Sequence, residues 1–346
     1  MKRTIALLLG VLLLCFSLLP ISVCAASEDT AALQAKFLDG VSTDGTDYVY
    51  YSPAKGILDT TYYPLIIFFH GEDVGLSKRS QIDKNGFINY ASEAYQARFQ
   101  GGGGCFLFAP RGKNGGWLDA KVTDVKANID QFIRAHQSNI DTKRIYLIGY
   151  SRGADFLWKM LDGYPKFFAG AIPAAAIVQP DASVTGKLQN TAVWIFSSDN
   201  DTYYSANTIN AREVFKNMKK ATYNLESVRL TAFSNVLLPN GEFIPGSGLM
   251  LMPDTHSVWY AVTNDMHLND GTPYPSNTTV DGMDHYIDIG YSTGVIDWLS
   301  QQTIEGAKSY DVPDEVRVPF RFLEFFLNFL RNLFSRFFGA AALIED

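Results

Sequence analysis

The chain has few cysteines and histidines and no excess of basic residues. Of its 346 residues, three are cysteine and five are histidine, and the formal net charge is −7 with a pI near 5.3. Because no basic stripe is available to displace phosphate counterions, we expect no nucleic-acid partner. No segment repeats at a fixed period, which excludes solenoid folds. The hydrophobic content of 47% is ample for a sizeable core, so disorder is not expected.

The N-terminus has the features of a secretory signal peptide. Charged residues at 1–3 precede an apolar run over residues 5–19, which is short for crossing a bilayer, and small residues follow at 23–26. We therefore expect residues 1–26 to be removed and the protein to be secreted. Cleavage there leaves a single cysteine, Cys105, whose apolar surroundings predict a buried core thiol rather than a disulfide partner or a nucleophile.

Strand-like and helix-like segments alternate through the middle of the chain. Apolar runs and alternating patterns predict strands at residues 47–52, 63–69, 105–109, 145–148, 169–174, 192–197 and 225–233. Helical spacing predicts helices at residues 87–100, 120–137, 206–220 and 295–299, and another directly after residue 151. This order predicts an α/β domain over residues 27–308, with a doubly wound, mostly parallel sheet and helices on both faces.

The predicted strand at residues 145–148 leads into a Gly-x-Ser-x-Gly motif centred on Ser151. Gly149 and Gly153 flank the serine, and a helix is predicted directly after it. In a strand–turn–helix context the serine sits at a strained apex where neighbouring side chains would collide, which explains the glycines. Its hydroxyl would then project beyond the sheet edge as a nucleophile, whereas a plain Gly-Ser loop is the alternative.

A serine nucleophile needs a histidine to take its proton. In folds with this motif the acid and then the histidine follow the serine along the chain, which leaves His256, His267 and His285. His256 lies in a loop with aromatic neighbours, and His285 precedes the predicted terminal helix. Both of these remain open on order alone.

The acid should follow the predicted strand at residues 192–197. Asp199 and Asp201 compete for this role, although a carboxylate there could merely cap the next helix. The oxyanion donors are expected to be the backbone N–H of Arg152, directly after the nucleophile, and that of Glu72, in the loop after residues 70–71. His70 is expected to brace that loop.

Several linked motifs in this order resemble a known family. The motifs are Phe69-His-Gly71, residues 144–153, Trp158, Tyr164-Pro-x-Phe167, Val193-Trp-Ile-Phe196 with its following Asp, and His256-Ser-Val-Trp259. Together, over roughly residues 45–302, they resemble the secreted α/β-hydrolases related to polyhydroxybutyrate depolymerases, feruloyl esterases and "predicted peptidases". The resemblance implies the α/β-hydrolase fold.

The resemblance also narrows the candidate site. The family's strand is followed by His-Gly, two residues and the catalytic Asp, which falls on Asp201, and its histidine precedes a tryptophan, as His256 precedes Trp259. Trp259 and Trp117 are expected to line the substrate site, although Trp117 fits a packing role equally well. The chain departs from the family at Arg152, where an apolar residue is common, and at residues 154–155 and 197–198.

These features predict a secreted serine hydrolase that cleaves carboxylic esters through Ser151, His256 and Asp201. Its substrate would be a small ester or an acylated carbohydrate or polymer, and no metal or organic cofactor is implied. A serine peptidase with the same triad is one alternative. A surface binding protein on a degraded hydrolase scaffold is another, and nothing in the sequence indicates the oligomeric state.

The character of the chain changes in residues 309–346. Residues 316–338 contain eight phenylalanines, four arginines and one glutamate, with polar residues mostly three or four positions apart. This pattern predicts an amphipathic helix that lies in an anionic membrane surface rather than spanning it. The alternative is that the helix packs on the hydrolase domain.

Overall fold

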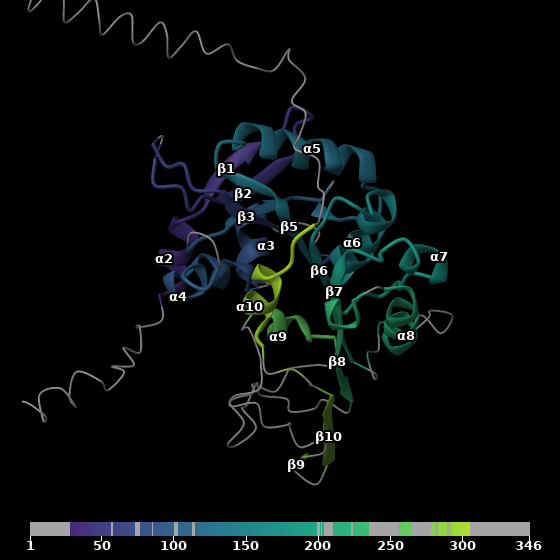
Figure 1. Cartoon of the computed structure of the whole chain (residues 1–346). Helices are drawn as coiled ribbons and strands as arrows, with labels where there is room; N and C mark the ends of the chain where they lie inside the picture. Colours follow the sequence, from purple (N-terminus) through teal and green to yellow (C-terminus); the bar gives the residue numbers. More distant parts are fainter. Residues whose placement is uncertain are drawn as a thin grey trace, which may run out of the picture.

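The computed structural model describes residues 28–56, 58–72, 77–84, 86–99, 103–112, 115–198, 201, 203, 210–222, 224–234, 256–263, 278–280, 283–288, 291 and 293–304 (Figure 1). The expected signal peptide and the phenylalanine-rich tail lie outside these residues. Within this part of the chain, no helix is long and apolar enough to cross a membrane.

The described strands form one sheet of ten strands in the order β1-β2-β4-β3-β5-β6-β7-β8-β10-β9. Their bounds are β1 Leu38–Val41, β2 Asp47–Tyr51, β3 Tyr63–Phe69, β4 Phe106–Pro110, β5 Ile140–Tyr150, β6 Gly170–Ala174, β7 Ala192–Ser198, β8 Val228–Ser234, β9 Thr278–Val280 and β10 Met283–Asp288. The six strands from β4 to β8 in this order are parallel, and β1, β2, β10 and β9 pair antiparallel at the two edges. The predicted mostly parallel, doubly wound sheet is thus confirmed.

Helices cover both faces of this sheet. Their bounds are α2 Thr30–Ala35, α3 Lys78–Lys84, α4 Glu93–Gln96, α5 Val122–Ala135, α6 Arg152–Gly163, α7 Ala182–Thr185, α8 Ala211–Ala221, α9 Trp259–Thr263 and α10 Val295–Ser300, with 3-10 turns η1 Phe87–Ala91 and η3 Leu225–Ser227. Side chains alternate between the faces along each strand. In β3, for example, Leu65, Ile67 and Phe69 join the core under α5, α6 and α8, whereas Ile66 and Phe68 join the core under η1, α9 and α10.

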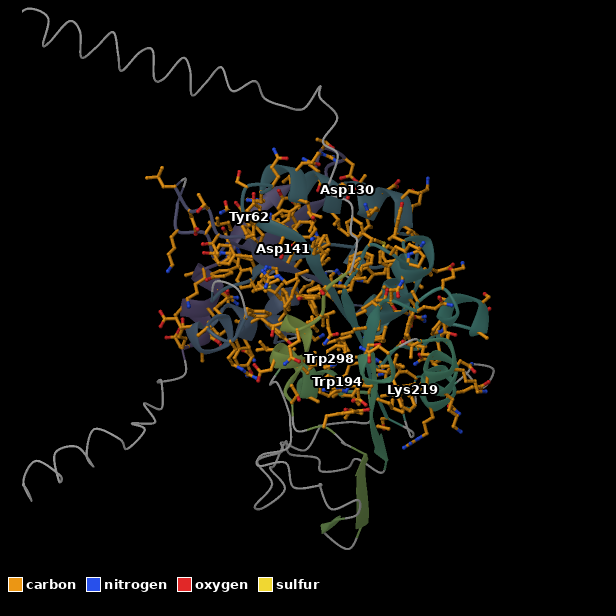
Figure 2. The ribbon with its side chains drawn as sticks, viewed as in Figure 1. Tyr62, Asp130, Asp141, Trp194, Lys219 and Trp298 are labelled. Carbon is orange, nitrogen blue, oxygen red and sulfur yellow. The ribbon has the colours of Figure 1, made fainter. Side chains whose placement is uncertain are left out.

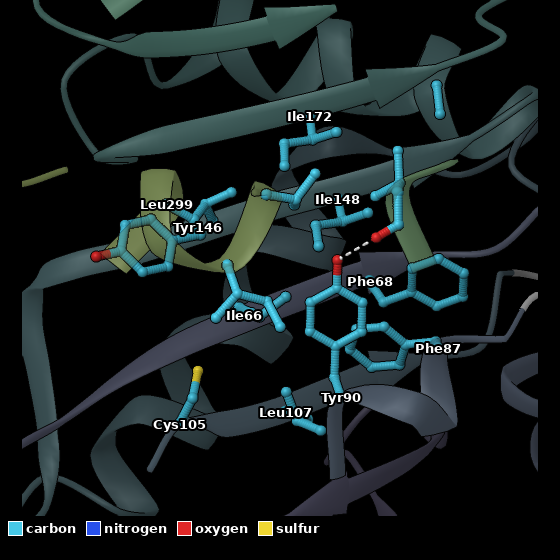
Figure 3. Packing of buried hydrophobic residues seen from close by; sticks show 14 of the residues in the cluster. Ile66, Phe68, Phe87, Tyr90, Cys105, Leu107, Tyr146, Ile148, Ile172 and Leu299 are labelled. Atoms are coloured by element: carbon cyan, nitrogen blue, oxygen red, sulfur yellow. Dashed lines mark hydrogen bonds between the residues drawn. The ribbon is translucent and has the colours of Figure 1, made fainter. Parts of the chain in front are cut away.

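Figure 3 shows the core on the η1 side of the sheet. Phe87 of η1 stacks on Phe68 of β3 with ring centroids 4.4 Å apart, and the Tyr90 hydroxyl donates to the carbonyl of Val262 in α9 at 2.9 Å. Cys105 lies in the same cluster with no exposed surface, and burial raises the pKa of its thiol well above the ordinary value. The prediction of a buried core thiol is therefore confirmed.

The C-terminal helix of the described chain is fastened to the sheet by aromatic packing. Trp298 of α10 meets Trp194 of β7 edge to face, with ring centroids 5.5 Å apart (Figure 2). The Trp194 indole donates to the Thr231 hydroxyl on β8 at 2.9 Å. Because a buried indole N–H needs an acceptor, this bond lets a large ring sit in the core without an unsatisfied donor.

Several parts of the fold differ from the sequence prediction, which contained none of the short helices α2, α3, α7 and α9. The helix expected at residues 87–100 is a 3-10 turn followed by the one-turn α4, because Ser92 adopts an extended backbone between them and its side chain accepts from the amide of Tyr95 as an N-cap. The antiparallel strands β1, β9 and β10 were not predicted. β10 extends the sheet beyond β8 at the lower end of the view in Figure 1.

Candidate active site

The turn between β5 and α6 holds Ser151 in a strained conformation. Ser151 has φ 54° and ψ −122°, a backbone region that residues other than glycine rarely adopt. Its N–H donates to the carbonyl of Ala174 at the end of β6 at 2.9 Å, and its carbonyl accepts from the amides of Ala154 and Asp155 in the first turn of α6. The strain is thus held in place by the neighbouring strand and by the helix.

Both flanking glycines are required by close backbone contacts. A Cβ on Gly149 would lie 2.6 Å from the carbonyl oxygen of Gly153. A Cβ on Gly153 would fall within 3.0 Å of the carbonyl oxygens of Phe69 and His70. The sharp turn and the close approach of α6 to the end of β3 therefore exclude any side chain at either position.

Ser151, His256 and Asp201 form one hydrogen-bonded row. His256 Nε2 lies 2.8 Å from Ser151 Oγ, and His256 Nδ1 lies 2.7 Å from Asp201 Oδ2. Three separate segments supply the row: the β5–α6 turn, the segment after β7, and the segment before α9. All three residues are buried, and the Asp201 side chain has no exposed surface.

The partners of His256 fix its tautomer. An ionised carboxylate can only accept, so Nδ1 carries the proton toward Asp201 and Nε2 is left to accept the hydroxyl proton of Ser151. Asp201 is itself oriented, because its Oδ1 accepts from the Tyr203 amide at 2.9 Å. This arrangement can take a proton from the serine as its oxygen attacks an electrophilic carbon.

Two tyrosines that were not singled out from the sequence contact the imidazole. The Tyr203 ring lies 4.4 Å from the His256 ring, centroid to centroid, and the Tyr150 ring lies 5.5 Å from it. Each is adjacent in sequence to a predicted site residue, since Tyr150 precedes Ser151 and Tyr203 lies two positions after Asp201. That adjacency was the only available signal, because sequence alone does not show which way a side chain points.

The N-terminus of α6 supplies the setting for an oxyanion. Arg152 is the first residue of this 12-residue helix, and the first amide of a helix has no partner inside the helix. Such amides and the helix dipole favour negative charge at this end. The Arg152 side chain also reaches the loop after β3, where its Nε lies 3.4 Å from Glu72 Oε2. The structure therefore brings both expected oxyanion residues to the same end of the sheet as Ser151.

His70 ties two loops together beside this site. It is 2% exposed, its Nε2 accepts from the Gly112 amide at 3.1 Å, and its Nδ1 is 2.6 Å from the Gly71 carbonyl. Since Nε2 accepts, the ring proton lies on Nδ1 and donates to that carbonyl. The His70 carbonyl in turn accepts from the indole of Trp117 at 2.8 Å. These bonds match the bracing role expected from the sequence.

Asp155 is a buried carboxylate one turn along α6 from the serine. It is 7% exposed, accepts from the Val178 amide at 2.8 Å, and pairs with Arg152 Nη1 at 3.1 Å. Burial raises the pKa of this carboxyl above the ordinary value, although the Val178 and Arg152 hydrogen bonds act in the opposite direction. Arg152, Asp155 and Glu72 thus form an ion-pair chain that joins the helix to two loops.

A cavity of about 340 Å³ opens beside this ion-pair chain. Its walls come from the loop after β4, the outer side of α6 and the loop after β6, and its lining residues are Trp117, Leu118, Arg152, Asp155, Phe156, Trp158, Lys159, Asp162, Val178, Gln179, Pro180 and Val184. Trp117 packs on Phe156 with centroids 4.9 Å apart and also lines this cavity, so the packing role is confirmed and the substrate-binding role stays a prediction. Trp259 does not line this cavity; its ring lies 5.3 Å from that of Tyr150, the tyrosine whose ring also contacts His256.

The other candidates for the histidine and the acid lie away from this row or outside the description. The backbone of His285 is in β10, paired with Thr278 of β9, and His256 is the histidine that contacts Ser151. Asp199 and His267 lie outside the described residues, whereas Asp201 contacts His256. Among the described residues, no group of three or more His, Cys, Asp or Glu side chains is placed to hold a metal ion.

Comparisons with known proteins find similar solved structures but no matching family model or curated protein. Among solved structures, a thermostable esterase is similar with a TM-score of 0.57 and 21% identity over 78% of this chain. The match spans 64% of the length of that esterase.

Two other solved structures match less of the chain. Est1E from Butyrivibrio proteoclasticus matches with a TM-score of 0.40 and 13% identity, over 66% of this chain and 95% of its own. A ferulic acid esterase matches with a TM-score of 0.41 and 12% identity, over 57% and 88%. With the sheet order and the turn at Ser151, the match to the thermostable esterase gives the chain the α/β-hydrolase fold, as the motifs implied.

Proposed function

We propose that this protein is a serine hydrolase that cleaves carboxylic esters through Ser151, His256 and Asp201. The observation that carries the proposal is the unbroken row of hydrogen bonds from Asp201 Oδ2 through both nitrogens of His256 to Ser151 Oγ, at 2.7 and 2.8 Å. A degraded scaffold that serves only for binding would have no need for the strained φ of Ser151.

In the proposed acylation step, Ser151 Oγ attacks the ester carbonyl carbon while its proton passes to His256 Nε2. The C=O π electrons move to the oxygen, which becomes the oxyanion of a tetrahedral intermediate. The backbone N–H groups of Arg152 and Glu72 would donate to this oxygen, aided by the α6 dipole. Asp201 stabilises the imidazolium that forms.

The intermediate then collapses and its C–O bond to the alcohol breaks. The leaving oxygen takes the proton from His256 Nε2, so an alcohol departs and an acyl group stays on Ser151. In deacylation, water loses a proton to the same nitrogen as it attacks the acyl carbon, and the proton returns to Ser151 when the acid leaves. Each half-reaction is balanced with no cofactor.

A fluorophosphonate probe and a panel of p-nitrophenyl esters test the proposal. Ser151→Ala should abolish labelling and lower kcat by about 10⁶-fold, and His256→Ala by a similar factor. The matched control is His285→Ala, which should keep wild-type turnover. Folded wild-type protein that neither labels nor hydrolyses any ester would refute the proposal, and chromogenic peptides cleaved in preference to esters would replace it with a peptidase.

We also propose that the protein is exported and contacts a membrane surface through residues 316–338. The signal-like residues 1–26 support export, and the four arginines among eight phenylalanines support contact with anionic lipid. In this arrangement the hydrolase domain would act close to a lipid surface.

A further inference from the structure

The cavity beside α6 is lined by Arg152, the residue that follows the proposed nucleophile, and by residues further along the same helix. Its lining residues on α6 include Arg152, Asp155, Lys159 and Asp162, which are three or four positions apart and therefore share one side of the helix. Ten residues of α-helix rise by about 15 Å. The cavity thus connects the residue after Ser151 with a point about three turns away.

The walls that the two loops contribute to the cavity carry apolar side chains that are exposed to solvent. Leu118 and Val178 are 59% and 53% exposed, and they belong to the few large hydrophobic side chains in the described chain that are exposed. They come from different loops, one after β4 and one after β6, yet both line this cavity. Pro180 and Val184 continue the same wall. Exposed apolar side chains gathered around one concavity indicate a binding site rather than scattered surface residues.

The cavity is held open by bonds already present in the structure. On one side, Trp117 is fixed by its hydrogen bond to the His70 carbonyl and by stacking on Phe156. On the other, Asp155 holds the Val178 amide. A preformed pocket of about 340 Å³ lies in the size range that accommodates small organic groups.

The charges around the cavity do not favour an ionic ligand. Two cations and two anions line it, and most of them are paired: Arg152 with Asp155, and Asp162 with Lys187. A charged ligand would have to compete with these pairs, whereas an apolar group would only displace water from apolar walls.

We propose that this cavity binds an apolar group of the ester, an alkyl chain or an aryl ring extending from the carbonyl held at Ser151. The inference rests on the proposed hydrolase function and specifies its substrate class: esters with one long apolar arm. Arg152 lies at the junction, because it follows the nucleophile and also lines the cavity. An arm from either the acyl or the alcohol side has the same chemistry, and the experiment separates the two.

The experiment compares chain-length dependence in two matched variants. Leu118→Asn makes one cavity wall polar, and Leu225→Asn makes the same change at a similarly exposed leucine, 56% exposed, that does not line the cavity. Asparagine suits the turn at residue 118, so folding should be preserved. One arm measures kcat/KM for p-nitrophenyl acetate through decanoate, and the other for acetate esters of short and long alcohols.

We expect kcat/KM in the wild type to rise with length in one arm, and Leu118→Asn to lower the long-to-short ratio in that arm by about fivefold. Leu225→Asn should leave the ratio unchanged. A wild type without length preference in either arm, or equal ratios in both variants, would overturn the cavity assignment while leaving the hydrolase intact. Absence of Ser151-dependent turnover on every ester would instead remove the proposed function, and this assignment with it.

Discussion

The substitution Asp155→Asn removes the negative charge of this residue and keeps an oxygen that can accept a hydrogen bond. At first sight the change should be costly, because it removes one partner of a buried ion pair, a loss that often costs about 3–5 kcal/mol. Two features argue against this. Arg152 is 28% exposed by its side chain and keeps Glu72 as a second partner, so it would not become a buried, unpaired charge. An asparagine oxygen can still accept from the Val178 amide.

The titration of Asp155 sets the sign of the effect. Its pKa in the folded protein is raised above the ordinary value of 3.8, with burial as the largest cause. The stability linked to this group is therefore fully present below the unfolded pKa, and it is lost as the pH rises through the raised folded pKa. At neutral pH the free-energy cost of burying the ionised carboxylate exceeds the stabilisation from its hydrogen bonds. A neutral replacement should therefore be tolerated.

We expect Asp155→Asn to change the free energy of unfolding at pH 7 by less than about 1 kcal/mol. Asp155→Ala, which leaves the Val178 amide without its acceptor, should cost about 1–3 kcal/mol. As the pH falls toward 4, the wild type should gain stability relative to Asp155→Asn, because its carboxyl takes up a proton in the fold. Urea unfolding at several pH values measures these differences, with equal m-values as the test of two-state behaviour.

The control is Asp162→Asn, which makes the same change at an exposed ion pair on the same helix and should cost no more than about 0.5 kcal/mol. A loss above about 2 kcal/mol in Asp155→Asn at pH 7, with an unchanged m-value, would show that the ionised carboxylate stabilises the fold. A wild type that loses stability relative to Asp155→Asn as the pH falls would contradict the sign derived above.

Two further predictions concern the serine turn and the tail. Gly153→Ala should destabilise the fold by about 3 kcal/mol or more in urea unfolding, because its methyl group would meet the carbonyl oxygens of Phe69 and His70, which are fixed backbone atoms. The control Gly116→Ala, whose Cβ would have open space, should not change the stability. Removal of residues 313–346 should release the protein from anionic liposomes in a flotation assay and leave turnover of short esters nearly unchanged. Loss of folding on truncation would instead favour packing of the tail on the hydrolase domain.

Much of the fold could be predicted because its signals are local. Strands buried on both faces, such as residues 63–69, read as continuous apolar runs, and the glycines around Ser151 mark a turn that admits no side chain. The break in the helix expected at residues 87–100 depends on a competition between the Ser92 cap and continued helix, which apolar spacing does not reveal. The short strand β10 depends on pairing with β8, a partner about 50 residues earlier in the chain, and β9 depends in turn on pairing with β10.

The site also has parts that the sequence predicted and parts that it did not. Chain order and the family resemblance led to His256, which the fold brings to Ser151, and to Asp201, which it brings to His256. Neither source of inference could place Tyr150 and Tyr203 against the imidazole, because their contacts depend on side-chain direction at turns. No local sequence pattern predicts the cavity, because Leu118, Val178 and the outer side of α6 come together only when three segments of the chain pack.

The departures from the family pattern at Arg152 and Asp155 form a single unit in the structure. Arg152 pairs with Asp155 within α6 and with Glu72 across to the loop after β3, while Asp155 holds the loop after β6. An apolar residue at 152 would leave Asp155 buried without a cation, and a small residue at 155 would leave the Val178 amide without its acceptor. The two changes are therefore physically dependent on each other. Because they join the nucleophile's helix to the loops on both sides, they also connect the expected oxyanion donors with the cavity wall.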